Sequence, residues 1–197
     1  MCLVILCMKI LYIHGYGSNG QAYKAKLLSQ MMPDCEVISP TFDYDRLSPE
    51  MIIGQLRQLV SQHSPAMIMG SSMGGYFALC CLSFFRGKVW CINPVRDVVS
   101  TIRMLAQRNL ALAQSDAFAQ RLQEYHDFNQ RYFVNAHAHD GQLHLALSTD
   151  DEVLGDHRPL LDLFSNAAQV VWKEDSGHVF LRFSELADVL AQQEPIG

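Results

Sequence analysis

Apolar runs that alternate with amphipathic stretches constrain the fold of this chain most strongly. The apolar, β-branched or aromatic runs occupy residues 3–13, 36–39, 66–70, 88–92, 143–148 and 168–172. Stretches with helical periodicity lie between or after them, at about 20–31, 50–62, 73–86, 157–166 and 179–192. Strands that are apolar on both faces need helices on both sides. The pattern therefore predicts an α/β protein with a mostly parallel sheet of about six strands, flanked by helices and joined by right-handed crossovers.

One segment, residues 95–136, breaks the alternation because it is helical throughout and contains no strand-like run. It is too long for an ordinary crossover, and we interpret it as a helical cap inserted over one end of the sheet. A pair of ordinary surface helices is the alternative. With a length of 197 residues, residues 1–197 are expected to form a single domain that includes this insertion.

Charge and cysteine content restrict the partners and the compartment. The 15 basic and 20 acidic residues give a net charge of −5, and no dense basic cluster indicates a nucleic-acid partner. The six cysteines form no CxxC pair and lie mostly inside apolar runs. We therefore expect free thiols in a protein of the reducing cytoplasm, and not a framework of disulfides. The apolar start lacks the charged beginning of a signal peptide and is too short to span a membrane. We interpret it as a buried strand, with Met8 as an alternative start.

The stretch "MIMGSSMGGYFAL" at residues 67–79 places two serines between glycines at a strand-to-helix junction. Gly70 to Gly74 has the form G-x-S-x-G, which in this context is typical of a nucleophile elbow with Ser72 at its tip. The helix that follows would favour negative charge developing there. A closely packed Gly/Ser turn without chemistry is the alternative.

A nucleophilic serine needs a base and a carboxylate that orients the base. Asp150 and Asp151 follow the run 143–148, and His178 follows the run 168–172. The order Ser, Asp, His is the one that this kind of sheet uses. The spacing therefore predicts a catalytic triad.

An oxyanion hole would need two backbone N–H groups close to the serine. Met73 follows the serine directly, and Tyr16 lies in the loop "HGYGSNG" after the first strand. We expect these two residues to supply the N–H groups. His14 of the same loop is interpreted as a structural hydrogen bonder rather than a second base.

The stretches that carry a resemblance to a known family are "LYIHGYGSNGQAYKAKLL", "MGSSMGGYFAL", "CINPVR", "STDDEVL" and "DSGHVFLRF". Together they resemble the small bacterial α/β-hydrolases of the YqiA-like esterase family over residues 10 to about 183. The resemblance implies the α/β-hydrolase fold and a serine esterase or thioesterase that acts on modest acyl chains without a cofactor. It also implies Ser72 as nucleophile, His178 as base and Asp151 as acid. Two departures are the long segment 95–136 and Asp150, which stands where the family commonly has glycine.

Several alternatives remain open at this stage. A D-x-x-V pattern selects Asp150 as the acid, whereas D-E-V-L selects Asp151, which we favour. Cleavage of carboxylic esters is the preferred activity, with a thioesterase as the alternative and a non-catalytic binding protein as a third. His137, His139 and Asp140 are interpreted as part of a polar loop and not as metal ligands. Asn93-Pro94 is interpreted as the start of the cap, or as part of the acyl pocket.

Overall fold

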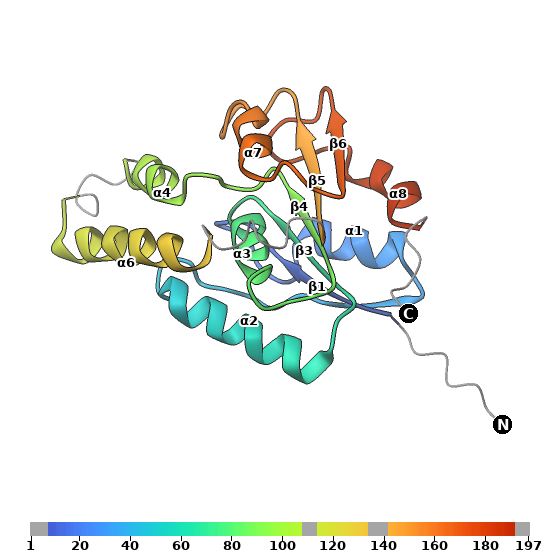
Figure 1. Ribbon diagram of the computed structural model, residues 1–197, viewed down its shortest axis with the longest axis horizontal. Coiled ribbons are helices and arrows are strands. Elements are labelled where there is room, and N and C mark those ends of the chain that lie inside the picture. Colours follow the sequence, from blue (N-terminus) through green and yellow to red (C-terminus); the bar gives the residue numbers. More distant parts are fainter. Residues whose placement is uncertain (1–7, 108–113, 134–141, 192–197) are drawn as a thin grey trace.

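The computed structural model describes residues 8–107, 114–133 and 142–191, and Figure 1 shows its sheet at the centre of the molecule. Six strands pair in the order β2-β1-β3-β4-β5-β6, and all five pairings are parallel. The strands are β1 (Met8–Ile13), β2 (Cys35–Ile38), β3 (Met67–Ser71), β4 (Lys88–Ile92), β5 (Leu143–Ser148) and β6 (Gln169–Lys173). The predicted parallel sheet of about six strands is confirmed.

The α-helices are α1 (Tyr23–Met31), α2 (Pro49–His63), α3 (Met73–Cys81), α4 (Val98–Ala106), α6 (Asp116–Tyr132), α7 (Arg158–Leu163) and α8 (Ala187–Ala191). A 3₁₀ helix, η2 (Phe183–Leu186), precedes α8. The predicted helix 73–86 ends early, at Cys81, and the one predicted from 179 begins only at Phe183. Its start is delayed because Gly177 and Phe180 adopt positive φ, which no helix accommodates.

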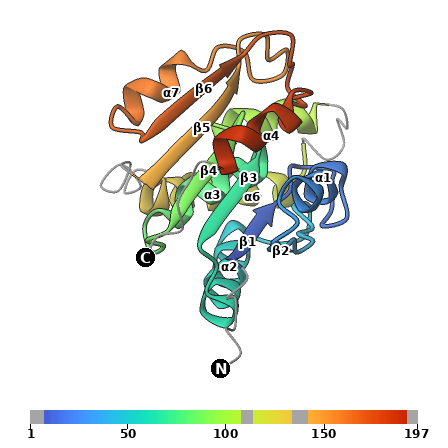
Figure 2. The same cartoon turned by 90° about the vertical axis from the view of Figure 1, so that its right-hand side faces the viewer.

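Two hydrophobic cores lie on opposite faces of the sheet, because successive strand residues point to opposite sides. Leu11 packs in the core that α2, α3, α6 and α7 cover, whereas its neighbour Ile10 packs in the core under α1, η2 and α8. Figure 2 shows α8 in front of the sheet and α1 beside it. Burial on both faces explains why β3, "MIMGS", is buried along its whole length.

Helices α4 and α6 form the described part of segment 95–136. They contact each other, and Figure 1 shows them together at the left of the view, to one side of the sheet. Ser115 caps the start of α6 by accepting a hydrogen bond from the Phe118 N–H. The structure agrees with the predicted helical content, and the role of a cap stays a prediction.

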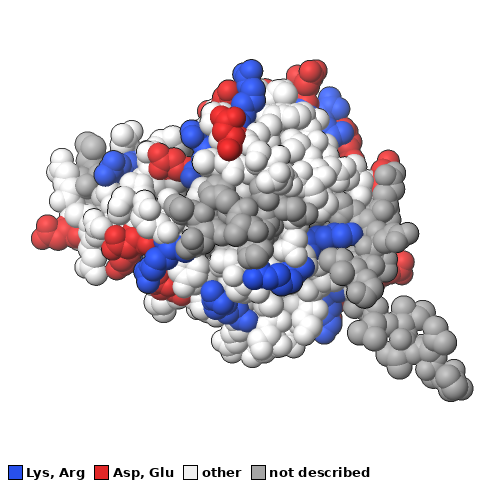
Figure 3. Space-filling view, in the orientation of Figure 1, with Lys and Arg blue, Asp and Glu red and all other residues white. Residues whose placement is uncertain are grey.

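The surface carries charges of both signs on the face drawn in Figure 3. Within the described residues no helix has the length and apolar character needed to cross a membrane. Cys80, Cys81 and Cys91 are buried free thiols, and each packs as a small apolar side chain in the core under α3.

Candidate active site

Ser72 occupies a tight turn between β3 and α3. Its backbone has φ +54° and ψ −118°, a conformation that costs free energy for a residue with a side chain. Glycines flank it for a steric reason. A Cβ on Gly74 would collide with the Ile13 carbonyl oxygen, and a Cβ on Gly70 with that of Gly74. The strand, the turn and the helix therefore meet too closely for any other residue at these two positions.

The two serines of the turn have different surroundings. Ser71 is buried, and its Oγ lies 3.0 Å from the hydroxyl of the buried Tyr12. Ser72 is half-buried at the tip of the turn. Ser71 therefore satisfies a buried hydroxyl of β1, while Ser72 is the one that can meet a substrate.

The structure brings Ser72, His178 and Asp151 together from three strand ends. His178 Nε2 lies 3.0 Å from Ser72 Oγ, and His178 Nδ1 lies 3.0 Å from both carboxylate oxygens of Asp151. These contacts form the hydrogen-bond chain of nucleophile, base and acid. With Nδ1 donating to the carboxylate, Nε2 is left to accept the serine proton.

Asp151 is held by more than the candidate base. Its Oδ1 accepts hydrogen bonds from the N–H groups of Val153 and Leu154 at 2.9 and 2.8 Å. His157 Nε2 lies 2.9 Å from its Oδ2. Burial acts to raise the pKa of Asp151, but the hydrogen bonds from His157, His178 and the Leu154 N–H outweigh it and hold the pKa well below its usual range. Asp151 is therefore a carboxylate across the physiological range.

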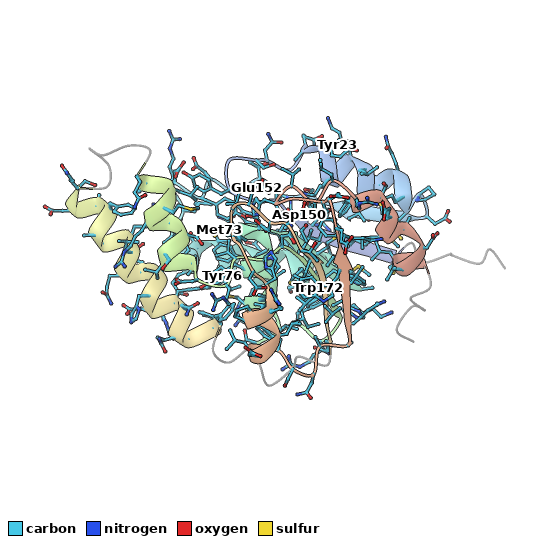
Figure 4. The ribbon with its side chains drawn as sticks, turned by 90° about the horizontal axis from the view of Figure 1, so that it is seen from above. Tyr23, Met73, Tyr76, Asp150, Glu152 and Trp172 are labelled. Carbon is cyan, nitrogen blue, oxygen red and sulfur yellow. The ribbon has the colours of Figure 1, made fainter. Side chains whose placement is uncertain are left out.

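Asp150 serves a different part of the site. Its Oδ1 accepts hydrogen bonds from the N–H groups of Ser176 and Gly177, both at 3.1 Å. Glu152 Oε2 accepts one from the His178 N–H at 2.8 Å. Seen from above in Figure 4, both of these carboxylates lie over the middle of the sheet. Asp150 and Glu152 thus flank Asp151 in the sequence and hold the backbone that carries His178. Asp151, and not Asp150, contacts the imidazole.

Asn93 is a structural residue whose role the sequence did not reveal. It is fully buried with φ +40°. Its Oδ1 accepts a hydrogen bond from the Ser148 N–H at 2.8 Å, and its Nδ2 lies 3.0 Å from both Ser148 Oγ and the Gly177 carbonyl oxygen. Asn93 therefore ties the ends of β4 and β5 to the loop that carries His178. From the sequence it is interpreted as the start of the cap or as part of the acyl pocket. Its partners lie 55 and 84 residues away in the chain, where no local pattern could indicate them.

The loop after β1 lies against the candidate nucleophile. A Cβ on Gly15 would come within 3.3 Å of Ser72 Cβ. His14 is buried, with Nδ1 2.8 Å from the Gly15 carbonyl oxygen and Nε2 accepting the Phe42 N–H at 2.9 Å. Burial lowers the pKa of His14, and the hydrogen bond to Gly15 opposes this only in part. His14 is thus a neutral imidazole that shapes the loop, which agrees with its predicted structural role.

A cavity of about 480 Å³ lies next to this loop and under the helices of segment 95–136. We call it the α6 cavity. It is lined by Tyr16, Tyr44, Asp45, Met73, Ile102, Leu105, Ala106, Ala117, Phe118, Arg121 and Tyr125. Tyr16 and Met73, the two predicted donors to an oxyanion, thus border the same space.

No group of three or more His, Cys, Asp or Glu side chains among the described residues could hold a metal ion. The stretch with His137, His139 and Asp140 lies outside those residues.

Comparison with known sequences identifies relatives along nearly the whole chain. The model of a family described as "Uncharacterised protein family (UPF0227)" matches residues 9–192. A UPF0227 protein of Enterobacter sp. (strain 638) is 27% identical over 183 residues, which cover 89% of this chain and 92% of the relative. The UPF0227 protein YcfP of Escherichia coli O9:H4 (strain HS) is 26% identical with the same coverage.

Solved structures with the same architecture include several esterases. The esterase domain of a Rhodothermus marinus protein gives a TM-score of 0.65 at 19% identity, covering 93% of this chain and 85% of that one. Est1E from Butyrivibrio proteoclasticus gives 0.69 at 10% identity, covering 94% and 88%. At such identities the likeness shows the fold alone, and the fold is that of the α/β-hydrolases, as the sequence resemblance implied.

Proposed function

Since the chain belongs to the UPF0227 family, which is described as uncharacterised, we propose its function from its own geometry: a serine hydrolase that cleaves carboxylic esters of small to medium acyl chains. The observation that carries the proposal is the continuous contact from Ser72 Oγ through His178 to Asp151. The names of the structural neighbours, several of them esterases, support the same reaction class.

The reaction would proceed through an acyl-enzyme. His178 takes the proton of Ser72 as its Oγ attacks the carbonyl carbon, and Asp151 offsets the charge of the imidazolium. The backbone N–H groups of Tyr16 and Met73 donate to the oxyanion. The alcohol leaves with the proton from His178. Water then attacks the acyl-enzyme, with His178 as base, and the carboxylic acid departs from Ser72. No step needs a metal or a cofactor.

The α6 cavity is the proposed place for the acyl chain. Tyr16 and Met73 line it together with apolar side chains of α4 and α6. Its volume of about 480 Å³ lies within the usual range for small-molecule sites. Helices α4 and α6 would then act as the predicted cap, because their side chains supply much of the lining of this cavity.

Labelling with a fluorophosphonate probe tests the nucleophile directly. The probe should add to one peptide of the wild-type protein, the one that contains Ser72, as read by mass spectrometry. Ser72→Ala should give no adduct and should lose ester turnover by several orders of magnitude. Ser71→Ala is the matched control, since Ser71 contacts Tyr12 inside the fold, and it should still be labelled.

An active Ser72→Ala protein, or a folded wild type that the probe does not label, would overturn the proposal. A thioesterase would use the same residues. The ratio of kcat/KM for p-nitrophenyl esters to that for acyl-CoA thioesters of equal chain length decides between the two activities.

A further inference from the structure

The α6 cavity is apolar along most of its wall and polar at one part. Its apolar lining comes from Met73, from Ile102, Leu105 and Ala106 of α4, and from Ala117 and Phe118 of α6. Its polar lining comes from Tyr16, Tyr44, Asp45, Arg121 and Tyr125. A cavity of this kind binds a mainly apolar group and orients it through a few hydrogen bonds.

Tyr125 is the unusual member of the polar group. Its side chain is 1% exposed, and its hydroxyl has no hydrogen-bond partner among the described residues. Burial raises the pKa of Tyr125, so the hydroxyl keeps its proton and can donate. Buried hydroxyl groups are nearly always hydrogen-bonded, and one that is not requires a physical explanation. A ligand oxygen in the cavity that Tyr125 lines would supply the missing partner.

Each of the other polar side chains of the cavity has at least one partner, and the Tyr44 hydroxyl donates to the His14 carbonyl oxygen at 2.6 Å. The Tyr16 hydroxyl donates to Asp45 Oδ1 at 2.7 Å, and Arg121 Nη1 donates to the Tyr44 carbonyl oxygen at 2.5 Å. Burial and the hydrogen bond to Asp45 raise the pKa of Tyr16 to about 12, so it remains a donor to that carboxylate.

The charges of the cavity indicate which ligand group fits. Arg121 and Asp45 have opposite sign and line the same space. A carboxylate on the ligand would meet Asp45, and an ammonium group would meet Arg121. An uncharged oxygen avoids both repulsions and still accepts a hydrogen bond.

We propose that the α6 cavity selects acyl chains that carry an uncharged oxygen, a keto or hydroxyl group, for hydrogen bonding to the Tyr125 hydroxyl. This substrate class rests on the proposed ester hydrolysis. Tyr125 is then a specificity-determining residue, because a chain without the oxygen offers its hydroxyl no acceptor.

Matched pairs of p-nitrophenyl esters test the proposal. Each pair has the same length and differs by one CH₂ replaced with C=O: pentanoate and 4-oxopentanoate, heptanoate and 6-oxoheptanoate, nonanoate and 8-oxononanoate. Every rate is divided by the uncatalysed rate of the same ester. For at least one pair we expect wild-type kcat/KM to favour the oxo ester about tenfold, mainly through a lower KM. In Tyr125→Phe the ratio should fall to about one.

Tyr23→Phe is the matched control, because Tyr23 is 73% exposed at the start of α1 and Figure 4 shows it well away from Met73. Its ratios should equal those of the wild type. A second readout is independent of turnover: removing a hydroxyl that has no partner breaks no hydrogen bond, so Tyr125→Phe should keep or raise the wild-type Tm.

The outcomes separate this inference from the proposed function. Ratios near one for all three wild-type pairs, with plain esters still cleaved in a Ser72-dependent reaction, would overturn the inference and leave the esterase intact. A lower Tm in Tyr125→Phe would also overturn it, since the hydroxyl would then have a partner inside the protein. Failure to cleave any ester would remove the proposed function and the inference together.

Discussion

His157 Nε2 lies 2.9 Å from Asp151 Oδ2, on the same carboxylate that His178 Nδ1 contacts at 3.0 Å. Asp151 is therefore held between two histidines, of which only His178 reaches Ser72. The side chain of His157 is 4% exposed and that of Asp151 is fully buried. A second hydrogen bond to a charged carboxylate is strong at a site that is shielded from water. His157 therefore fixes the Asp151 carboxylate more firmly than His178 alone would.

Removing the donor at position 157 should slow the proposed reaction. We expect His157→Phe to lower kcat/KM for p-nitrophenyl butyrate about tenfold, because one hydrogen bond to a charged group contributes about 1.5–3 kcal/mol and only part of it acts on the transition state. His157→Gln should recover much of the loss, since its side-chain amide can donate to Asp151. His126→Phe, at an exposed position of α6, controls for the added ring. Equal activity in both His157 variants and the wild type would contradict a positioning role.

Asp150 and Asp151 should differ sharply when each is changed to asparagine. Asp151→Asn should lower kcat by about 10³–10⁴, because the imidazole loses the carboxylate that sets its tautomer. Asp150→Asn keeps an oxygen that can accept from the Ser176 and Gly177 N–H groups, so its kcat should stay within about tenfold of wild type. Steady-state rates with p-nitrophenyl butyrate measure both. The opposite order would assign the acid to Asp150.

Features that depend on local periodicity could be predicted from the sequence. Ile10 and Leu11 are adjacent apolar residues of one strand, and the sequence therefore predicts a strand that is apolar on both faces. In the structure the two side chains do lie on different faces of the sheet. The start of α2 follows from Ser48 and Pro49, and Ser48 Oγ does accept the Met51 N–H at 3.2 Å. The contact between Ser72 and His178 could also be predicted, because parallel strands bring their carboxyl ends to the same edge of the sheet.

Contacts between segments that carry no motif of their own could not be predicted. His157 lies six residues from Asp151 in the sequence, yet only the fold of the intervening loop turns its ring back toward the carboxylate. Asn93 depends on Ser148 and Gly177, each from another strand end. The Tyr125 hydroxyl has no hydrogen-bond partner in the described part of the chain, and this could not be predicted. Helical periodicity places a tyrosine of α6 in the core but does not indicate which groups surround its oxygen.

The low pKa of Asp151 makes a prediction about acid stability. In the folded protein the pKa of this carboxyl is held well below the value of about 3.9 expected in the unfolded chain. Between the two pKa values the unfolded state binds more protons, so the free energy of unfolding rises with pH in that window. The contribution of Asp151 should therefore be complete above about pH 5 and be lost progressively as the pH falls toward 2.

Asp151→Asn isolates that contribution, because an amide does not titrate there. The difference in unfolding free energy between wild type and variant should be about 2–3 kcal/mol near pH 6 and should shrink on acidification. Urea unfolding at several pH values between 2.5 and 6 measures it. The comparison of two proteins cancels the effect of Asp97, Asp156 and Glu185, whose pKa values are also lowered. The pKa of Asp150 is lowered too, but the Asp151 charge acts to raise it, so the effect of Asp150 cancels only in part. A difference that does not change with pH would contradict the prediction.

Asn93 should be the most sensitive single residue for holding the site together. In Asn93→Ala the buried Ser148 N–H loses its partner, and alanine must adopt φ +40°, so we expect about 3 kcal/mol of lost stability. Ser148→Ala keeps the bond from its N–H to Asn93 Oδ1 and should lose only about 1 kcal/mol. Urea unfolding gives both values. Asn93 and Ser148 both donate to the Gly177 carbonyl oxygen, but only Asn93 also donates to the His178 carbonyl oxygen, at 3.2 Å. The Asn93→Ala variant should therefore lose ester turnover, measured at a temperature where it is fully folded, by more than Ser148→Ala does. Similar stability and turnover for the two variants would mean that β5 and the His178 loop hold their positions without Asn93.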